Sequence, residues 1–206
     1  PMTKPKPANP ALSISHPDLA SALEQIGTEI DLQPLRSSAL ARIMRETFHG
    51  SDAGGAWDWR MAYDLMQAAA VQELLRGDGV AGDIAAARLL ASRLLTETRR
   101  SEQQIRLQQF STPLPFAALV LRAAAIRKGE TVLEPSAGTG ALATFAARAG
   151  ATLLLNEIDP FRQRLLRAVF GGEVTGHDGE HIDDLLQTPV LPDVVVMNPP
   201  FASSVD

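Results

Sequence analysis

Residues 131–140 have the sequence TVLEPSAGTG, and this stretch predicts the fold of the second half of the chain. The apolar residues 131–133 predict a β-strand, and the glycines that follow predict a turn that opens a helix at Ala141. A strand, a glycine turn and a helix in this order let backbone N–H groups approach a ligand closely. Glycine pairs also serve in purely structural strand-to-helix turns, so this stretch alone leaves both interpretations open.

The acid at the end of the strand, Glu134, narrows the class of ligand. A carboxylate in this place would repel a pyrophosphate, whereas it would attract a cationic ligand. The pattern G-x-G-x-x-G, which nicotinamide- and flavin-binding proteins use at this turn, does not occur in the stretch. The sequence therefore disfavours a dehydrogenase and favours a positively charged ligand.

Helices and strands alternate around this turn. Helical patterns cover residues 113–127, 141–148 and 160–170, and short apolar strands are predicted at 131–133, 152–155, 174–175 and 194–197. Uniformly apolar strands separated by helices are typical of a parallel sheet that is covered on both faces. Ligands of such sheets bind beyond the carboxyl ends of the strands. The predicted fold class is therefore α/β, with a Rossmann-like parallel sheet.

The first half of the chain has a different pattern. Residues 1–16 are rich in proline and predict a flexible lead-in. Residues 17–107 predict a helical region, with Leu19, Leu23 and Ile26 at helical spacing in its first helix. Further helices are expected over residues 37–48, 57–75 and 84–107. The chain is thus divided into a lead-in, a helical region and a partial α/β region over residues 108–206.

The second predicted strand ends in another acidic segment, NEIDP at residues 156–160. Glu157 lies about 20 residues after Gly138, which is the spacing at which an acid after the second strand binds ribose hydroxyls. An acid at the start of a helix is also favoured by the helix dipole alone. That structural explanation suits Asp159, directly before the helix, better than it suits Glu157.

Two more strand ends carry polar residues. The segment 176–184, GHDGEHIDD, has the residue types of a metal site, but its composition is also common in acidic loops. We therefore expect no metal there, and we expect Asp178 to accept a hydrogen bond from an adenine amino group. The fourth strand is followed by Asn198, two prolines and Phe201, which together supply a stiff set of carbonyl acceptors and a flat apolar ring.

Composition excludes several classes of protein. The chain has 206 residues, a formal net charge of −5, 45% hydrophobic residues and no cysteine. It can therefore bury a core, and it can form neither a disulfide scaffold nor a thiolate metal site. Its apolar runs are too short to span a bilayer and no signal peptide is recognisable, so we expect a cytoplasmic protein without a membrane partner. Its mild acidity argues against coating nucleic acid through bulk charge.

Taken in order, these strand ends resemble those of class I S-adenosylmethionine-dependent methyltransferases, and more narrowly the enzymes that methylate adenine N6 in DNA. The similarity covers about residues 105–201. It implies that S-adenosyl-L-methionine is the cofactor. The residues implied to bind it are Phe110, Ser111, Thr112, Pro113, Glu134, Pro135, Ser136, Ala137, Gly138, Gly140, Glu157, Ile158, Asp178, Gly179 and Asn198. The residues implied to be catalytic are Asn198, Pro199, Pro200 and Phe201, the N-P-P-[YF] loop of that family.

The resemblance also implies a division of roles. The segment before the first strand, with Thr112, would contact the methionine end of the cofactor, and Glu134 and the glycine turn would lie under it. Glu157 would bind the ribose and Asp178 the adenine of the cofactor. Asn198 and the Pro199 carbonyl would accept both hydrogens of the target amine, which favours a pyramidal nitrogen with its lone pair toward the methyl group.

The combination of a helical region with the methyltransferase-like part is similar to the methylase part of large bacterial and phage methylase–helicase fusion proteins of the strawberry-notch-like, antirestriction type. We therefore expect DNA as partner, with RNA as an alternative, and further domains of a longer chain, including a helicase. The sheet is expected to be truncated after its fourth strand, so this chain should bind the cofactor weakly and methylate little by itself. The same residues also fit methylation of a protein glutamine amide, or a module that binds the cofactor without catalysis.

Overall fold

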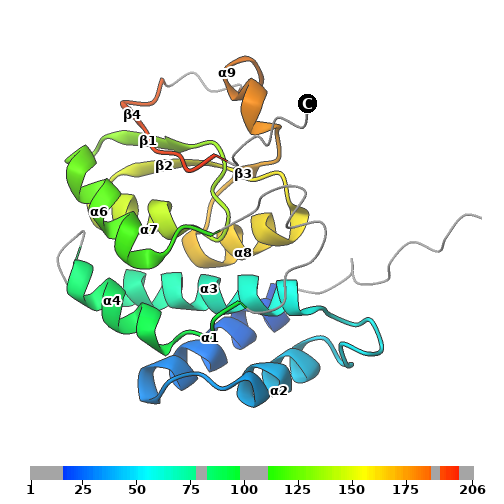
Figure 1. Ribbon diagram of the computed structural model, residues 1–206. Helices are drawn as coiled ribbons and strands as arrows, with labels where there is room; N and C mark the ends of the chain where they lie inside the picture. Colours follow the sequence, from blue (N-terminus) through cyan, green and yellow to red (C-terminus); the bar gives the residue numbers. More distant parts are fainter. Residues whose placement is uncertain (1–15, 78–82, 98–110, 187–190, 200–206) are drawn as a thin grey trace, which may run out of the picture.

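The computed structural model describes residues 16–77, 83–97, 111–186 and 191–199 (Figure 1). Its helices are α1 (His16–Leu32), α2 (Ser37–Thr47), α3 (Trp59–Arg76), α4 (Ile84–Arg93), α6 (Leu114–Ala124), α7 (Ala141–Arg148), α8 (Pro160–Phe170), the 3-10 helix η2 (Gly179–His181) and α9 (Ile182–Leu185). Its strands are β1 (Thr131–Glu134), β2 (Thr152–Asn156), β3 (Val174–Thr175) and β4 (Val194–Val195). Most of the predicted lead-in lies outside the described residues.

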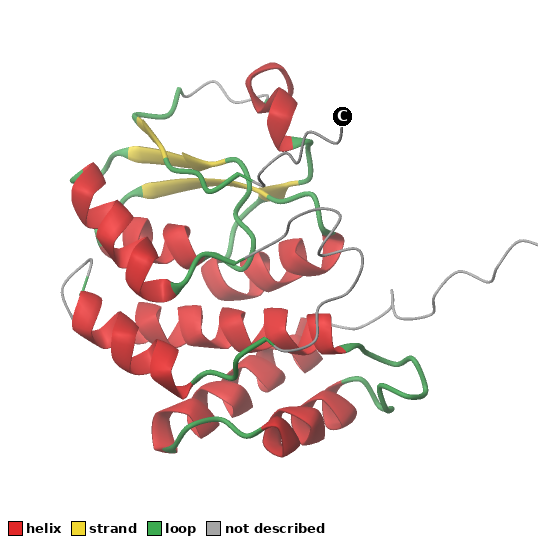
Figure 2. Ribbon diagram, in the orientation of Figure 1, coloured by secondary structure: helices red, strands yellow, loops and turns green. Residues whose placement is uncertain are grey.

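The four strands form one parallel sheet in the order β3-β2-β1-β4 (Figure 2). In the centre of the sheet, Leu133 of β1 is paired with Leu154 of β2 on one side and with Val195 of β4 on the other. Parallel neighbours need a crossover connection, and α7 and α8 supply two of them. This mixed α/β architecture is the one that the sequence predicts, and it is compatible with a Rossmann-like fold.

Apart from η2 and α9, the described helices are stacked in layers on one side of the sheet (Figure 1). α6, α7 and α8 lie next to the sheet, α3 and α4 pack against them, and α1 and α2 lie beyond α3. One hydrophobic cluster reaches from Leu23 of α1 through Met66 of α3 and Phe145 of α7 to Val132 of β1. The helical region and the α/β region therefore share a buried core.

The opposite face of the sheet is covered unevenly in the part of the chain that the structure describes. Val194 and Val196 pack with the core on the helical side, so the alternation along the strand directs Val195 to the other face. There the Val195 side chain is 46% exposed, whereas its neighbour Leu133 is buried. The prediction of a sheet covered on both faces therefore fails at β4, because the described connection from β3 to β4 contains only the short helices η2 and α9.

α4 ends earlier than the helix predicted over residues 84–107. Directly after Arg93, Leu94 is extended, with φ −80° and ψ 154°. The Arg93 carbonyl oxygen accepts a hydrogen bond from the backbone N–H of Leu35 at 2.8 Å, a tertiary partner in place of the next helical turn. A contact with a residue so distant in sequence overrides local helix propensity. The rest of the predicted helix, residues 98–107, lies outside the described part.

Several other elements differ from their predicted bounds, three of them by two or three residues at one end. α3 starts at Trp59 rather than at residue 57, because Asp58 caps it by accepting the backbone N–H of Met61 at 2.8 Å. α6 stops before Ala125, which takes a left-handed conformation with φ 51°. β4 is two residues long rather than four, although Val196 still donates its N–H to β1.

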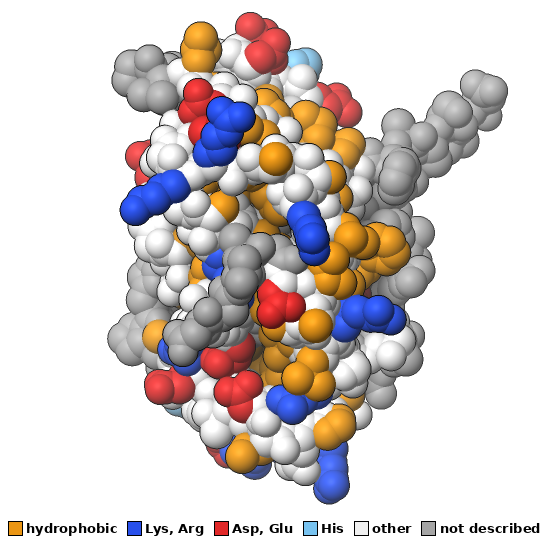
Figure 3. Space-filling model, turned by 90° about the vertical axis from the view of Figure 1, so that its left-hand side faces the viewer, with side chains coloured by type: hydrophobic (Ala, Val, Ile, Leu, Met, Phe, Trp, Pro, Cys, Tyr) orange, Lys and Arg blue, Asp and Glu red, His pale blue; other side chains and the backbone are white. Residues whose placement is uncertain are grey.

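Some apolar side chains remain on the outside of the helices. Figure 3 views the molecule from the side on which α6 lies in Figure 1, and hydrophobic side chains are exposed among charged ones there. On α6, Phe116, Leu119 and Val120 are exposed and share one face of the helix. None of the described helices is both long enough and apolar enough to span a membrane.

Candidate functional site

The carboxyl ends of the four strands lie at one edge of the sheet, because all the strands run in the same direction. Glu134 ends β1 and Glu157 follows β2, while Asp178 comes shortly after β3 and Asn198 shortly after β4. Four positions that are far apart in the sequence are thus brought to the same edge, where parallel sheets bind their ligands.

Asn156 joins the ends of three strands. Its Nδ2 donates to the carbonyl oxygens of Pro135 (2.8 Å) and His177 (2.9 Å). Its Oδ1 accepts from the Thr175 hydroxyl (2.8 Å) and from the His177 backbone N–H (2.9 Å). The sequence pattern does not single out this residue as part of a site. The one feature of the sequence that could have indicated Asn156 is its position, as a polar amide directly after the apolar residues 153–155.

The loops after β1 and β3 touch each other. A Cβ added to Gly179 would lie 3.0 Å from Ser136 Oγ and 3.1 Å from the Pro135 carbonyl oxygen, so a side chain here would push the two loops apart by a few tenths of an ångström. Ala137 in turn donates its backbone N–H to the Asn156 carbonyl oxygen at 2.9 Å. Four of the residues expected to bind cofactor, Pro135, Ser136, Ala137 and Gly179, therefore form one continuous backbone surface.

The two glycines of the turn have different reasons to be glycine. Gly138 has φ +57°, and a Cβ there would meet nothing within 4 Å, so it faces open space. Gly140 has φ +91°, and a Cβ there would lie 2.5 Å from the ring of Phe170. Gly140 is thus needed for the packing of α8 against the start of α7, while Gly138 leaves room for a ligand beside the turn.

Glu157 connects the glycine turn with the loop after β2. Its Oε2 accepts the backbone N–H of Gly138 and its Oε1 that of Asp159, at 2.7 and 2.8 Å. The side chain is buried, and burial raises its pKa, against the effect of the two N–H donors and of the Arg162 charge. Both carboxylate oxygens therefore have protein partners, and a bound ribose would have to share them.

Glu134 is the less satisfied of the two buried acids. The backbone N–H of Ala143 donates to this carboxyl, whereas Oε2 is buried and has no hydrogen-bond partner among the described residues. Burial raises the pKa of Glu134 well above its ordinary value, and the nearby charge of Glu157 raises it further. The free oxygen of Glu134 leaves bonding capacity for a ligand, and a positively charged ligand would favour the ionised form of this carboxyl.

Asn198 meets the segment that precedes α6. Its Nδ2 donates to Thr112 Oγ1 at 3.0 Å, across 86 residues of sequence. In this orientation of the amide, Oδ1 points away from Thr112. Asn198 and Pro199 are exposed, as is Pro113, and Ser111 is half-buried. The other predicted members of these two segments, Phe110, Pro200 and Phe201, lie outside the described residues.

Asp178 and Ile158 lie at the outer rim of the site. Asp178 is exposed, and its Oδ1 accepts the backbone N–H of Glu180 at 3.1 Å, which caps η2. Ile158 is 54% exposed, although it is a large apolar residue. An exposed carboxylate and an exposed apolar side chain are each of a kind that can contact a purine ring.

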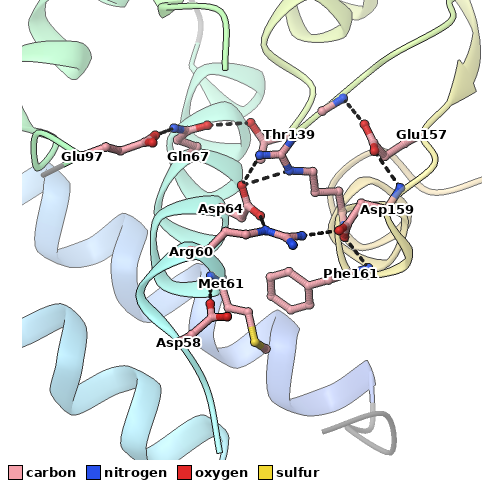
Figure 4. Close-up of polar contacts among 12 residues, drawn as sticks. Asp58, Arg60, Met61, Asp64, Gln67, Glu97, Thr139, Glu157, Asp159 and Phe161 are labelled. Atoms are coloured by element: carbon pink, nitrogen blue, oxygen red, sulfur yellow. Dashed lines mark hydrogen bonds and ion pairs between the residues drawn. The ribbon is translucent and has the colours of Figure 1, made fainter. Parts of the chain in front are cut away.

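Residues of α3 that the sequence pattern does not mark also reach the site (Figure 4). Gln67 accepts a hydrogen bond from the Thr139 hydroxyl in the glycine turn, at 3.1 Å. Arg60 donates to Asp159, the residue that caps α8 next to Glu157. Nothing in the sequence of the helical region signals these contacts, because their partners are in the other half of the chain.

The described residues also line a shallow cavity of about 290 Å³ near the last turns of α7 and α8, with Ala151, Leu153 and Phe170 in its wall. It lies toward the amino end of β2, away from the strand ends considered above. In the part of the chain that the structure describes, no cluster of three His, Asp or Glu residues is placed to hold a metal ion.

Comparisons with known proteins provide no relative for this geometry. No family model, no curated protein and no solved structure matches the chain. The function of the site is therefore inferred from its residues and from their arrangement.

Proposed function

We propose that this chain carries a class I methyltransferase core, which transfers a methyl group from S-adenosylmethionine to the exocyclic amine of a nucleic-acid base, with adenine N6 in DNA as the substrate. The hydrogen bond from Asn198 to Thr112 carries the proposal. It joins the segment that the family resemblance assigns to the target base with the segment assigned to the methionine end of the cofactor.

The strand ends fit a ligand of this kind in charge and in space. Glu134 has a buried oxygen without a partner among the described residues, which suits a cation better than any anionic cofactor. Gly138 borders open space beside the turn. Glu157 and Asp178 add carboxylates for hydroxyl and amino groups. Together these features support the assignment of S-adenosylmethionine.

The chain's own contribution to the reaction is mainly to position the amine. The cofactor supplies a methyl group on a positively charged sulfur, which accepts the bonding electrons when the amine nitrogen attacks. An amine conjugated to a purine is a weak nucleophile because its lone pair is delocalised. Asn198 Oδ1 and the Pro199 carbonyl oxygen can accept its two hydrogens and so favour a pyramidal nitrogen, and its surplus proton then passes to water.

Thr112 has a distinct part in this arrangement. Its hydroxyl oxygen accepts Asn198 Nδ2, and in this orientation of the amide Oδ1 is available to an amine. The family resemblance gives Phe201 the task of stacking on the base, which must leave the duplex to be reached.

The first test is calorimetric titration of the whole chain with S-adenosylmethionine. Glu157→Gln and Asp178→Asn are each expected to weaken binding about 10- to 100-fold, the effect of losing a hydrogen bond to a charged group. Asp183→Asn removes an equal charge at an exposed position of α9 and is the matched control, expected to bind like the parent. Failure of the parent to bind would contradict the cofactor assignment.

The second test is transfer of labelled methyl to adenine-containing DNA at enzyme concentrations near those of the DNA. Thr112→Val is expected to lower transfer about tenfold or more, and Thr112→Ser, which keeps the hydroxyl, is expected to restore it. Label found in RNA or in a glutamine peptide, but not in DNA, would replace the proposed substrate. Binding without transfer to any of the three would identify a non-catalytic cofactor-binding module.

A further inference from the structure

One face of α3 carries three polar side chains in the first half of the helix, where most of the neighbouring residues are apolar and buried. Arg60, Asp64 and Gln67 are four and three residues apart, so they lie above one another along the helix. Figure 4 shows them pointing from α3 toward the loops at the start of α7 and α8. We call these three residues the polar stripe of α3.

The first part of the stripe contacts the loop after β2. Arg60 pairs with Asp159, which caps α8 through the backbone N–H groups of Phe161 and Arg162. Asp64 Oδ1 accepts from Arg162 Nε at 3.0 Å and from Nη2 at 2.8 Å. Since the Asp159 N–H also donates to Glu157, the stripe is connected to a site residue through one intervening residue.

The second part contacts the loop after β1. Gln67 Oε1 accepts the Thr139 hydroxyl at 3.1 Å, and Gln67 Nε2 donates to Glu97. Thr139 stands between Gly138 and Gly140. A single helix of the helical region therefore contacts both loops that Glu157 joins from the other side.

The burial of this network argues for a positioning role. The side chains of Asp64 and Arg162 are 3% and 5% exposed, and those of Arg60 and Asp159 are 11% and 10% exposed. Removing four charges from water offsets much of what their pairing gains, and apolar side chains of similar size often stabilise such a place as well or better. What the charged pairs add is fixed geometry at the loop after β2 and the start of α8.

We propose that Arg60, Asp64 and Gln67 are positioning residues for the loops after β1 and β2, so that ligand binding at the strand ends depends on the docking of α3. This inference rests on the site proposed above for S-adenosylmethionine. It assigns to the helical region a direct part in forming that site, in addition to its part in the core.

The test measures amide hydrogen exchange of Gly138 and Asp159, the two donors to Glu157, in the free protein. Gln67→Leu removes the acceptor of Thr139 without adding a charge. It is expected to speed exchange at Gly138 about tenfold over the parent, after correction for any change at the slowest core amides. Arg60→Met is expected to speed exchange at Asp159, and Arg60→Lys, which keeps the charge opposite Asp159, to restore protection there.

Arg148→Met is the matched control. Arg148 of α7 donates to the Leu74 carbonyl oxygen at 2.7 Å, a contact between the same two layers at the opposite end of α3. It should lower overall stability without a selective change at Gly138 or Asp159. Equal effects of Gln67→Leu and Arg148→Met on the loops, or none from either, would overturn the proposal.

Titration with S-adenosylmethionine separates this proposal from the proposed function. We expect Gln67→Leu to weaken binding about 5- to 20-fold and Arg148→Met to leave it within twofold, a difference in the range of couplings between sites. If the parent protein does not bind S-adenosylmethionine but Gln67→Leu still speeds exchange at Gly138, the cofactor assignment is rejected and the positioning role is retained. A parent that binds with the same affinity as Gln67→Leu would reject the positioning role alone.

Discussion

At the scale of single residues, two buried acids at the same sheet edge have different environments. Glu157 has two backbone donors and fastens two loops, whereas Glu134 has one donor and a buried oxygen without a partner among the described residues. Such an arrangement destabilises the free protein locally, because a buried polar atom has lost its water without gaining a partner. Residues of this kind are expected where a ligand completes the bonding.

Glu134→Gln is expected to stabilise the protein at pH 8 by roughly 1–3 kcal/mol, because the neutral amide avoids the cost of an ionised carboxyl in a buried position. Burial raises the pKa of Glu134 in the folded state, so its contribution to stability is fully present below the pKa of the unfolded chain. That contribution is lost as the pH rises through the folded pKa. The advantage of the glutamine variant should therefore shrink between pH 8 and pH 5 in urea denaturation.

The control for this prediction is Glu180→Gln, the same substitution at an exposed position. It is expected to change the free energy of unfolding by less than about 0.5 kcal/mol at either pH. Equal stability of Glu134→Gln and the parent at pH 8 would show that the carboxyl is satisfied in solution. The same variant is expected to bind S-adenosylmethionine less tightly, a gain in stability at the expense of the site.

At the scale of elements, the glycine turn has two roles. It borders the open space at the carboxyl ends of the strands, and it allows α7 and α8 to pack closely. α7 begins at Ala141 directly after Gly140, and its first turn lies against the end of α8, where Phe170 and Leu166 contact the position of the missing Cβ. The absence of a Cβ at Gly140, which has a left-handed conformation, therefore allows the two helices to approach this closely. Gly138 shares the conformation without the contact.

Gly140→Ala is expected to destabilise the fold by about 2–4 kcal/mol, because strain at positive φ adds to an overlap with the Phe170 ring. Gly138→Ala, with positive φ but open space around the Cβ, is the matched comparison and should lose only about 1–2 kcal/mol. Urea denaturation of both variants measures the difference. Similar losses at the two positions would mean that α8 does not pack against the turn as described.

At the scale of the whole molecule, the helical region and the α/β region behave as one packed unit. The same hydrophobic cluster includes Leu23, Met66, Phe145 and Leu165, from α1, α3, α7 and α8. The polar stripe of α3 crosses the same boundary. A boundary filled by shared core residues and buried ion pairs is expected to open only when both regions unfold.

Phe145→Ala tests this cooperativity. Phe145 belongs to α7 and is 1% exposed, so the substitution should lower stability by about 3–5 kcal/mol. Trp57 and Trp59 are the two tryptophans of the chain and both lie in the helical region, so their fluorescence reports that region alone. In the Phe145→Ala variant, we expect the unfolding midpoint measured by tryptophan fluorescence to decrease by the same amount as the midpoint measured by circular dichroism. An unchanged fluorescence midpoint would instead indicate two independent domains.

The sequence by itself determined the α/β class, the parallel sheet and the places of β1, β2 and β3. These follow from short apolar runs, glycine turns and Pro160 at the start of a helix, all of which act through neighbouring residues. It also located Glu134, Glu157, Asp178 and Asn198, because residues at the carboxyl ends of parallel strands must come together whatever the side-chain packing.

Only the tertiary structure decided which of these residues touch, and through what. The cross-link by Asn156, the bond from Asn198 to Thr112 and the early end of α4 all depend on partners far along the chain. Asp64 and Arg162, for example, are 98 residues apart. Local patterns carry no information on such pairs, because a buried donor is satisfied by whichever acceptor the packing of whole elements brings within reach.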